Sequence, residues 1–216
     1  MPAPINLTQK IRNHIQKHRI SQETALAVFV IYPDSIAAHE HALGAWLRLS
    51  VDLHRNHYPR RMHERKIFVN TWKLPGSLLT EALRNLHRHA ARRIWNNLDI
   101  MVVIHCHMTP DYFLDFGGYL VSRNAVVHAC DQLPHLSGLL LLGCYSGGGR
   151  IAQSKDFPVI GFIGEVDYDD LPRLTVGFLN HFQFCRLRRI AVNPAIDIAL
   201  DASCTQWIPR NKVTIK

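Results

Sequence analysis

The chain has 216 residues, of which 47% are hydrophobic, and it carries a formal net charge of +8. This length and apolar content support one substantial core, and no glycine- or serine-rich linker divides the chain, so we expect a single domain over residues 1–216. The five cysteines are odd in number and lack CxxC spacing. That pattern excludes a disulfide framework and favours reduced thiols.

The charge and the hydropathy pattern also bear on location and partners. The first ten residues contain few apolar side chains, and no stretch approaches the roughly 20 apolar residues that span a bilayer, so we expect a cytoplasmic protein with no membrane partner. Basic residues are dense in segments 55–66 and 84–93, which suggests nucleic-acid binding. No RNA-binding, zinc-finger or helix-turn-helix pattern accompanies them, so nucleic acid is an alternative partner that the sequence does not favour.

Strands and helices are predicted to alternate along the first half of the chain. Residues 1–20 indicate a short basic amphipathic helix, and Ala25 to Tyr32 indicates a β-branched and aromatic strand ended by proline. A helix with apolar side chains at helical spacing follows over about 36–53. Lys66 to Thr71 is a second predicted strand, and a helix with a core-facing stripe begins at Ser77.

The second half continues the alternation. Strands are predicted over 100–105, from Gly138 toward Cys144, and over 158–163, with a hairpin around Gly117 and Gly118. Helices are predicted over about 124–133, 171–184 and 193–203. Strands that alternate with helices predict a three-layer α/β/α sandwich with a mostly parallel central sheet.

Two apolar segments end on residues that can do chemistry. The segment 101–108 carries His107, and the segment 138–149 carries Cys144. Because the carboxyl ends of parallel strands meet at one edge of a sheet, the thiol and the imidazole could meet there. Gly147 and Gly148 follow the cysteine, and they would let an extended substrate lie close to the backbone.

These motifs resemble a known family. The sequences IHCHM and LLLLGCYSGG resemble clan CD cysteine peptidases, the caspase-like group, and are most similar to its bacterial CHAT proteins. The likeness covers roughly residues 100–184, including a later strand followed by an acidic segment and a helix. It implies a caspase-like fold and an endopeptidase in which Cys144 is the nucleophile and His107 the catalytic histidine. It also implies a protein or peptide substrate and an activating protein partner, in a bacterial stress or defence response.

The resemblance further implies an oxyanion hole built from the backbone N–H groups of Cys144 and Met108. Met108 departs from the family, which usually has glycine there, and this difference motivates an alternative, a catalytically silent caspase-like interaction or scaffold subunit. Gly143 stands where the family usually has alanine or serine, which we expect to be a mild change.

Other residues leave choices open. His105 could replace His107, because residues two apart on a strand point to the same face. Acidic residues just after strand ends could bind a basic side chain before the cleaved bond, as in relatives that cut after arginine or lysine. These candidate substrate-binding residues are Asp111, Asp115, Asp167 and Asp169, with Glu165 and Asp170 nearby.

Two different chemistries compete with the peptidase. Cys144 and Arg150 fit the Cys-x5-Arg pattern of phosphatases, in which loop N–H groups cradle a phosphate. The triplet from His105 to His107 could supply metal ligands. Strand alternation sends Cys106 to the opposite face from the histidines, so we expect no metal site and no cofactor.

Overall fold

The computed structural model describes residues 25–33, 66–90, 98–133, 135–150, 156–167, 169–206 and 208–216. The helices predicted over 1–20 and 36–53 lie outside these residues.

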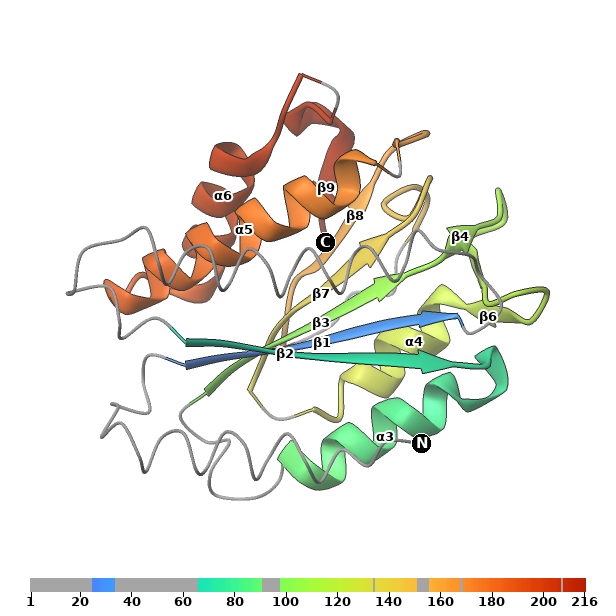
Figure 1. The fold of residues 1–216 in the computed structure, drawn as a ribbon. Coiled ribbons are helices and arrows are strands. Elements are labelled where there is room, and N and C mark those ends of the chain that lie inside the picture. Colours follow the sequence, from blue (N-terminus) through green and yellow to red (C-terminus); the bar gives the residue numbers. More distant parts are fainter. Residues whose placement is uncertain are drawn as a thin grey trace.

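A six-stranded sheet forms the centre of the fold, in the order β2-β1-β3-β7-β8-β9 (Figure 1). Every neighbouring pair is parallel except β8 and β9, which are antiparallel. The fold is therefore α/β with a mostly parallel sheet, as predicted. The strands are β1 (Ala25–Pro33), β2 (Lys66–Leu74), β3 (Leu98–His105), β7 (Leu136–Leu142), β8 (Val159–Phe162) and β9 (Val213–Ile215).

Helices cover both faces of this sheet (Figure 1). On one face lie α3 (Leu79–Ala90), which follows the 3-10 turn η3 (Gly76–Leu78), and α4 (Arg123–Cys130). On the other lie α5 (Asp170–Leu187) and α6 (Val192–Ser203). None of the helices in the described ranges is both long and apolar enough to cross a membrane.

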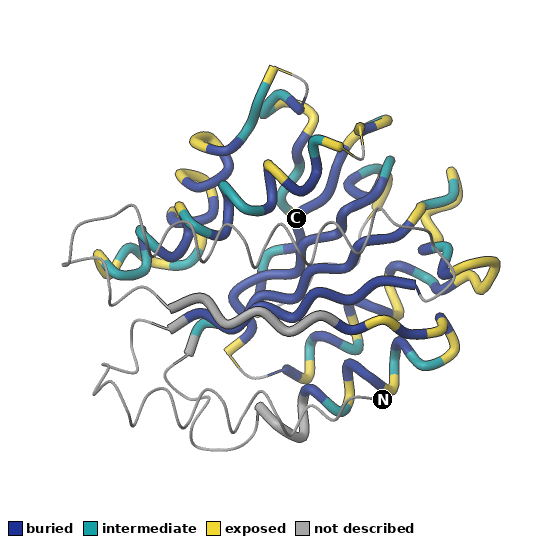
Figure 2. The backbone as a smooth tube through the Cα atoms, in the orientation of Figure 1, coloured by how far each residue is buried: buried dark blue, intermediate teal, exposed yellow. Residues whose placement is uncertain are grey.

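Burial explains why the central strands are continuous apolar runs. All seven residues of β7 are buried, and this central strand is dark blue along its length in Figure 2. A strand covered on both faces loses the alternation of apolar and polar residues that a half-exposed strand shows. Its side chains still alternate between two cores, since Leu139 and Leu141 pack with α3 and α4, whereas Leu140 and Leu142 pack with α5 and α6.

A small second sheet continues from the end of β3. It contains β4 (His107–Met108), β5 (Phe113–Asp115) and β6 (Leu120–Ser122), all antiparallel. The turn between β5 and β6 uses two glycines with φ of 69° and 89°, a left-handed conformation that glycine adopts easily. The predicted hairpin around Gly117 and Gly118 is confirmed.

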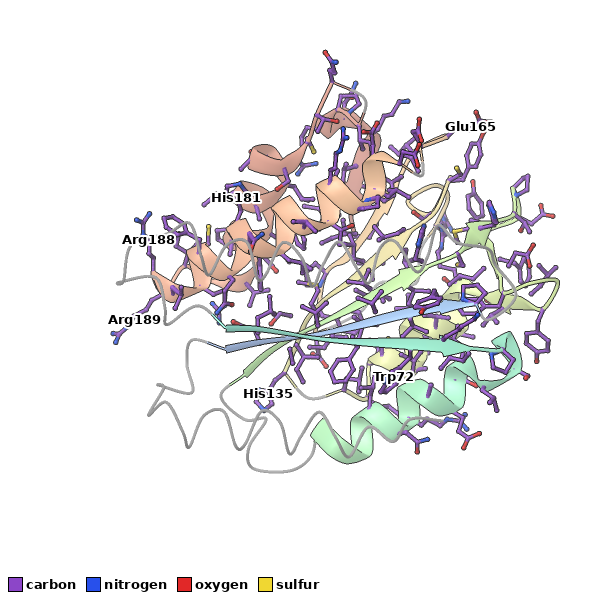
Figure 3. The ribbon with its side chains drawn as sticks, viewed as in Figure 1. Trp72, His135, Glu165, His181, Arg188 and Arg189 are labelled. Atoms are coloured by element: carbon purple, nitrogen blue, oxygen red, sulfur yellow. The ribbon has the colours of Figure 1, made fainter. Side chains whose placement is uncertain are left out.

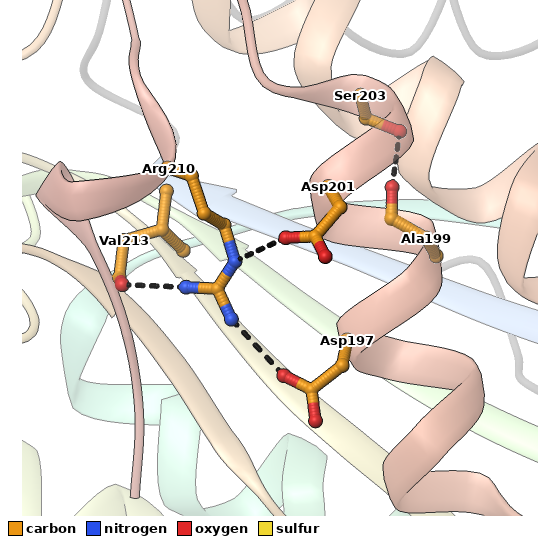
Figure 4. A network of polar contacts seen from close by, with 6 residues as sticks. All are labelled: Asp197, Ala199, Asp201, Ser203, Arg210 and Val213. Carbon is orange, nitrogen blue, oxygen red and sulfur yellow. Dashed lines mark hydrogen bonds and ion pairs between the residues drawn. The ribbon is translucent and has the colours of Figure 1, made fainter.

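The final segment holds an element that the sequence did not indicate. The 3-10 turn η5 (Arg210–Lys212) leads into β9, which pairs with β8 at the edge of the sheet. Arg210 fixes this segment to α6: Nε donates to Asp201, Nη2 to Asp197, and Nη1 to the carbonyl of Val213, at 2.9, 3.0 and 3.0 Å (Figure 4). The edge strand is therefore held by side-chain contacts from a neighbouring helix.

Candidate active site

The ends of β3 and β7 lie side by side. The last pair in their parallel register is His105 with Leu142, and the N–H of Cys106 continues the ladder by donating to the carbonyl of Leu142 at 3.3 Å. His107 and Cys144 each follow this last pair by two residues. The structure thus brings both predicted residues to the same edge of the sheet.

Strand alternation places the two side chains on one face. Cys144 packs against the core cluster of α5 and α6, whereas Cys106 and Met108 belong to the opposite cluster. His107 stands between Cys106 and Met108, so it points to the side on which Cys144 lies. The same alternation separates Cys106 from the histidines, as predicted.

The two candidate histidines differ in access to solvent. His105 is 1% exposed, whereas His107 is exposed and Cys144 is half-buried. A substrate that arrives from solvent reaches His107 without any rearrangement of the core. This contrast favours His107 over His105 as the partner of the thiol.

The Cys144 thiol contacts the backbone of one residue in the loop after β8. Its S–H donates to the carbonyl of Val166, with Sγ 3.7 Å from the oxygen, and the N–H of Val166 donates to Sγ at 3.5 Å. Sequence reasoning missed Val166, because an apolar residue that acts through its backbone leaves no mark in the sequence.

The loop after Cys144 is locked to the sheet. The hydroxyl of Ser146 donates to the carbonyl of Leu141 at 2.8 Å and accepts the N–H of Phe162 at 2.9 Å, so it bridges β7 and β8. Gly147 is buried, and a Cβ there would collide with the Thr214 hydroxyl and lie 2.8 Å from the carbonyl carbon of Gly161. Gly147 is thus needed for packing under the sheet edge, which corrects the expectation that it lies open to a substrate.

Tyr112 covers the next two glycines. A Cβ added to Gly148 would lie 2.9 Å from the Tyr112 ring, and one added to Gly149 would lie 2.6 Å from it. Gly149 also has φ of 62°. Gly148 is half-buried under this ring, so its backbone does not lie fully open to a substrate.

A buried arginine donates hydrogen bonds to the same loop. Arg123, the first residue of α4, is 2% exposed. Its guanidinium donates to the carbonyls of Ser146, Gly148 and Arg150 at 2.9, 2.7 and 3.1 Å, and it lies 4.6 Å from the centre of the Tyr112 ring. Burial lowers the pKa of Arg123 from its ordinary value, while the neighbouring Tyr112 raises it. Sequence reasoning missed Arg123, which looks like an ordinary surface residue at a helix start.

The loop does not form a phosphate cradle. Four successive N–H groups after the cysteine donate within the protein, and so cannot converge on an anion. The carbonyl of Arg150 faces Arg123, and the Arg150 residue is exposed. This arrangement argues against the phosphatase alternative. These four hydrogen bonds run from backbone N–H to carbonyl oxygen: Tyr145 to Gly164 at 2.8 Å, Ser146 to Gly143 at 3.3 Å, Gly147 to Phe162 at 2.8 Å, and Gly148 to Tyr145 at 3.0 Å.

The ladder between β4 and β5 determines where the Met108 N–H points. Met108 is opposite Leu114, and the next pair is hydrogen-bonded, because the N–H of Thr109 donates to the carbonyl of Phe113 at 2.9 Å. Hydrogen-bonded and non-hydrogen-bonded pairs alternate in an antiparallel ladder. The Met108 N–H therefore points away from β5 and is not used in this ladder.

Met108 and Gly143 fit together at the junction of the two strands. The Met108 side chain packs against the core cluster of α3 and α4, on the face opposite to that of His107. A Cβ at Gly143 would lie 2.5 Å from the carbonyl oxygen of Cys106 and 3.8 Å from the Cβ of Met108. Gly143 is therefore required by a close backbone approach, which corrects the expectation that its presence is a mild change.

The acidic candidates have different surroundings. Asp115 accepts the N–H of Gly118 at 2.7 Å, and Asp167 accepts the N–H of Asp169 at 2.9 Å, so these two carboxylates stabilise turns. Asp111 and Asp169 are exposed.

Glu165 accepts the hydroxyl of Tyr145 at 3.4 Å and raises the pKa of that phenol. The acidic residues thus line the site edge, with Asp115 and Asp167 engaged in the backbone of their own turns. In the described part of the chain, no three His, Cys, Asp or Glu side chains form a group that could hold a metal ion.

Comparison of the sequence with models of known protein families and with curated proteins gives no match. The resemblance to caspase-like peptidases therefore stays a prediction from the sequence motifs at His107 and Cys144.

Proposed function

We propose that this chain is a caspase-like cysteine endopeptidase, with Cys144 as its nucleophile and His107 as its proton-transferring histidine. One observation carries the proposal: the adjacent carboxyl ends of β3 and β7 present an exposed imidazole and a half-buried thiol on the same face of the sheet. A cysteine peptidase needs this pairing of a thiol with a nearby base.

The proposed reaction has two steps. His107 takes up the thiol proton as the Cys144 sulfur attacks the scissile carbonyl carbon, and then delivers that proton to the leaving amine, which departs as the C–N bond breaks. Water then attacks the acyl-enzyme thioester, and the thiol is released with the new carboxylate. The N–H of Met108, which points away from β5, and the N–H of Cys144 are the proposed oxyanion donors.

The catalytically silent alternative rested on Met108. Because its side chain packs on the opposite face from His107, this residue gives no steric reason for an inactive site. A need for an activating protein partner is part of the same proposal, since it comes from the family resemblance.

Thiol labelling tests the proposal. A peptide acyloxymethyl ketone should modify Cys144 faster than Cys204, the other half-buried cysteine among the described residues, whose pKa is raised by burial. His107→Ala should reduce the rate at Cys144 by 10²-fold or more, on the order expected for loss of a general acid or base. His128→Ala, which changes an exposed histidine on α4, is the matched control and should leave the rate unchanged. Equal labelling of wild type and His107→Ala would refute the dyad.

A further inference from the structure

The most exposed apolar side chains gather at one edge of the molecule. Among the described residues, seven large apolar side chains are exposed, and six of them follow the carboxyl ends of the strands or lie in the small sheet attached there. Clustered apolar surface marks a binding site more often than scattered residues do. The six are Tyr112, Phe113, Tyr119, Leu120, Tyr145 and Ile163; the seventh, Ile198, lies on α6.

Four of these side chains lie on or next to segments that contact the loop after Cys144, and we call them the apolar rim: Tyr112, Phe113, Tyr145 and Ile163. Tyr145 follows Cys144 directly, and its N–H donates to the carbonyl of Gly164 at 2.8 Å, so the backbone next to Ile163 lies beside Tyr145. The Tyr112 ring lies over the glycine loop, and Phe113 comes next in the chain. Aromatic side chains of this kind are enriched in protein–protein contacts.

The charges at this edge indicate the kind of partner. Four carboxylates and two bases are exposed near the rim, namely Asp111, Glu165, Asp167 and Asp169 with Arg150 and Lys212, so acidic groups are in excess there, whereas Arg188 and Arg189, after α5, are exposed at the opposite edge. Figure 3 shows Glu165 and the two arginines at opposite ends of the sheet. Carboxylates repel a nucleic-acid backbone and attract basic side chains. The surface around Cys144 therefore fits a polypeptide segment that is apolar and basic.

We propose that the apolar rim is the docking surface for the segment of the protein substrate that flanks the scissile bond. It selects an extended segment with a large apolar side chain next to that bond and basic residues beyond it. The assignment of the bound segment as a substrate rests on the proposed peptidase function, whereas the binding itself does not require any chemistry.

Peptide binding to the full-length Cys144→Ala chain tests the rim without cleavage. The probes are three fluorescein-labelled dodecapeptides of one design, with leucine and lysine, serine and lysine, or leucine and glutamate at the variable positions. The leucine–lysine peptide should bind most tightly by fluorescence anisotropy. Ile163→Ser in this background should weaken that binding about fivefold to tenfold, because half of an isoleucine side chain is available for burial there.

The chain supplies a matched control. Ile198→Ser makes the same change at an isoleucine of nearly equal exposure, 47% against 49%, and should leave the dissociation constant unchanged. Phe113→Ser, at the start of β5, should weaken binding as Ile163→Ser does. Equal affinity for the serine–lysine and leucine–lysine peptides, or equal effects of Ile163→Ser and Ile198→Ser, would overturn the proposal. Retained binding with no His107-dependent labelling would refute the peptidase and leave the rim as a peptide-binding surface.

Discussion

The Arg123 side chain should control the stability of the candidate active site. It makes three charge-assisted hydrogen bonds to loop carbonyls, and a hydrogen bond to a charged group contributes about 1.5–3 kcal/mol. The bond to the carbonyl of Ser146 is wholly buried, while the two to Gly148 and Arg150 are partly buried, so water can replace part of their contribution. We expect Arg123→Ala to lower the free energy of unfolding by about 2–4 kcal/mol.

Chemical and thermal unfolding measure this loss. For a chain of this size, each kcal/mol corresponds to about 2–4 °C in Tm, so the variant should melt on the order of 10 °C below the wild type. Arg123→Lys should recover only part of the difference, because an ammonium group lacks the planar fork that reaches three carbonyls. Arg84→Ala, at an exposed arginine on α3, serves as the control and should stay within about 0.5 kcal/mol of the wild type.

A second readout separates loop positioning from general stability. Below the unfolding transition, Arg123→Ala should change the rate at which iodoacetamide modifies Cys144, because the loop that follows the thiol loses its anchor. Arg84→Ala should not change that rate. A loss below about 1 kcal/mol in Arg123→Ala, together with an unchanged alkylation rate, would show that the three hydrogen bonds do not hold the loop.

Three further changes test other contacts. Gly143→Ala places a methyl group 2.5 Å from a backbone carbonyl oxygen and should cost about 1–3 kcal/mol in urea unfolding; unchanged stability would contradict the close approach. Asp99→Asn removes the charge that Arg186 binds at 2.8 and 3.1 Å, and should lower the free energy of unfolding by about 2 kcal/mol. This loss is smaller than that for a fully buried ion pair, because both side chains are partly exposed. The Glu165 carboxylate raises the pKa of Tyr145, so the folded state favours the neutral phenol. The stability that the neutral phenol contributes is therefore lost as the pH rises through the pKa of Tyr145 in the folded state. Glu165→Gln should bring phenolate absorbance to lower pH, measured as the difference from Tyr145→Phe, and an unshifted titration would refute this cause.

Much of the fold could be predicted from hydropathy alone. The strands at β1, β3 and β7 are long apolar runs, and the core-facing stripe of α3 has helical spacing, so burial and periodicity identify them. Boundaries moved by a few residues, as where α4 ends at Cys130 before the predicted end of its helix. The edge strand β9 was missed because its three residues have no apolar run, and contacts through Arg210 attach its segment to α6.

The candidate site was only partly predictable, for a different physical reason. His107 and Cys144 carry reactive groups at strand ends, so residue type and topology suffice to select them. The parts that shape the site act through backbone atoms and close contacts: Val166 bonds the thiol through its main chain, and Arg123 binds carbonyls that any residue could supply. Such roles depend on where a distant segment passes, which no local pattern in the sequence encodes.

The glycines of the loop after Cys144 also have a role that depends on packing and could not be predicted from the sequence. From the sequence, Gly147 and Gly148 suggest space left for a substrate, because glycine permits close approach. In the fold, the approaching groups belong to the protein itself: Thr214 and Gly161 press on Gly147, and Tyr112 covers Gly148. Under the proposed function, a substrate therefore lies over the exposed side chains of the apolar rim, where they meet acidic residues, and not along the glycine backbone.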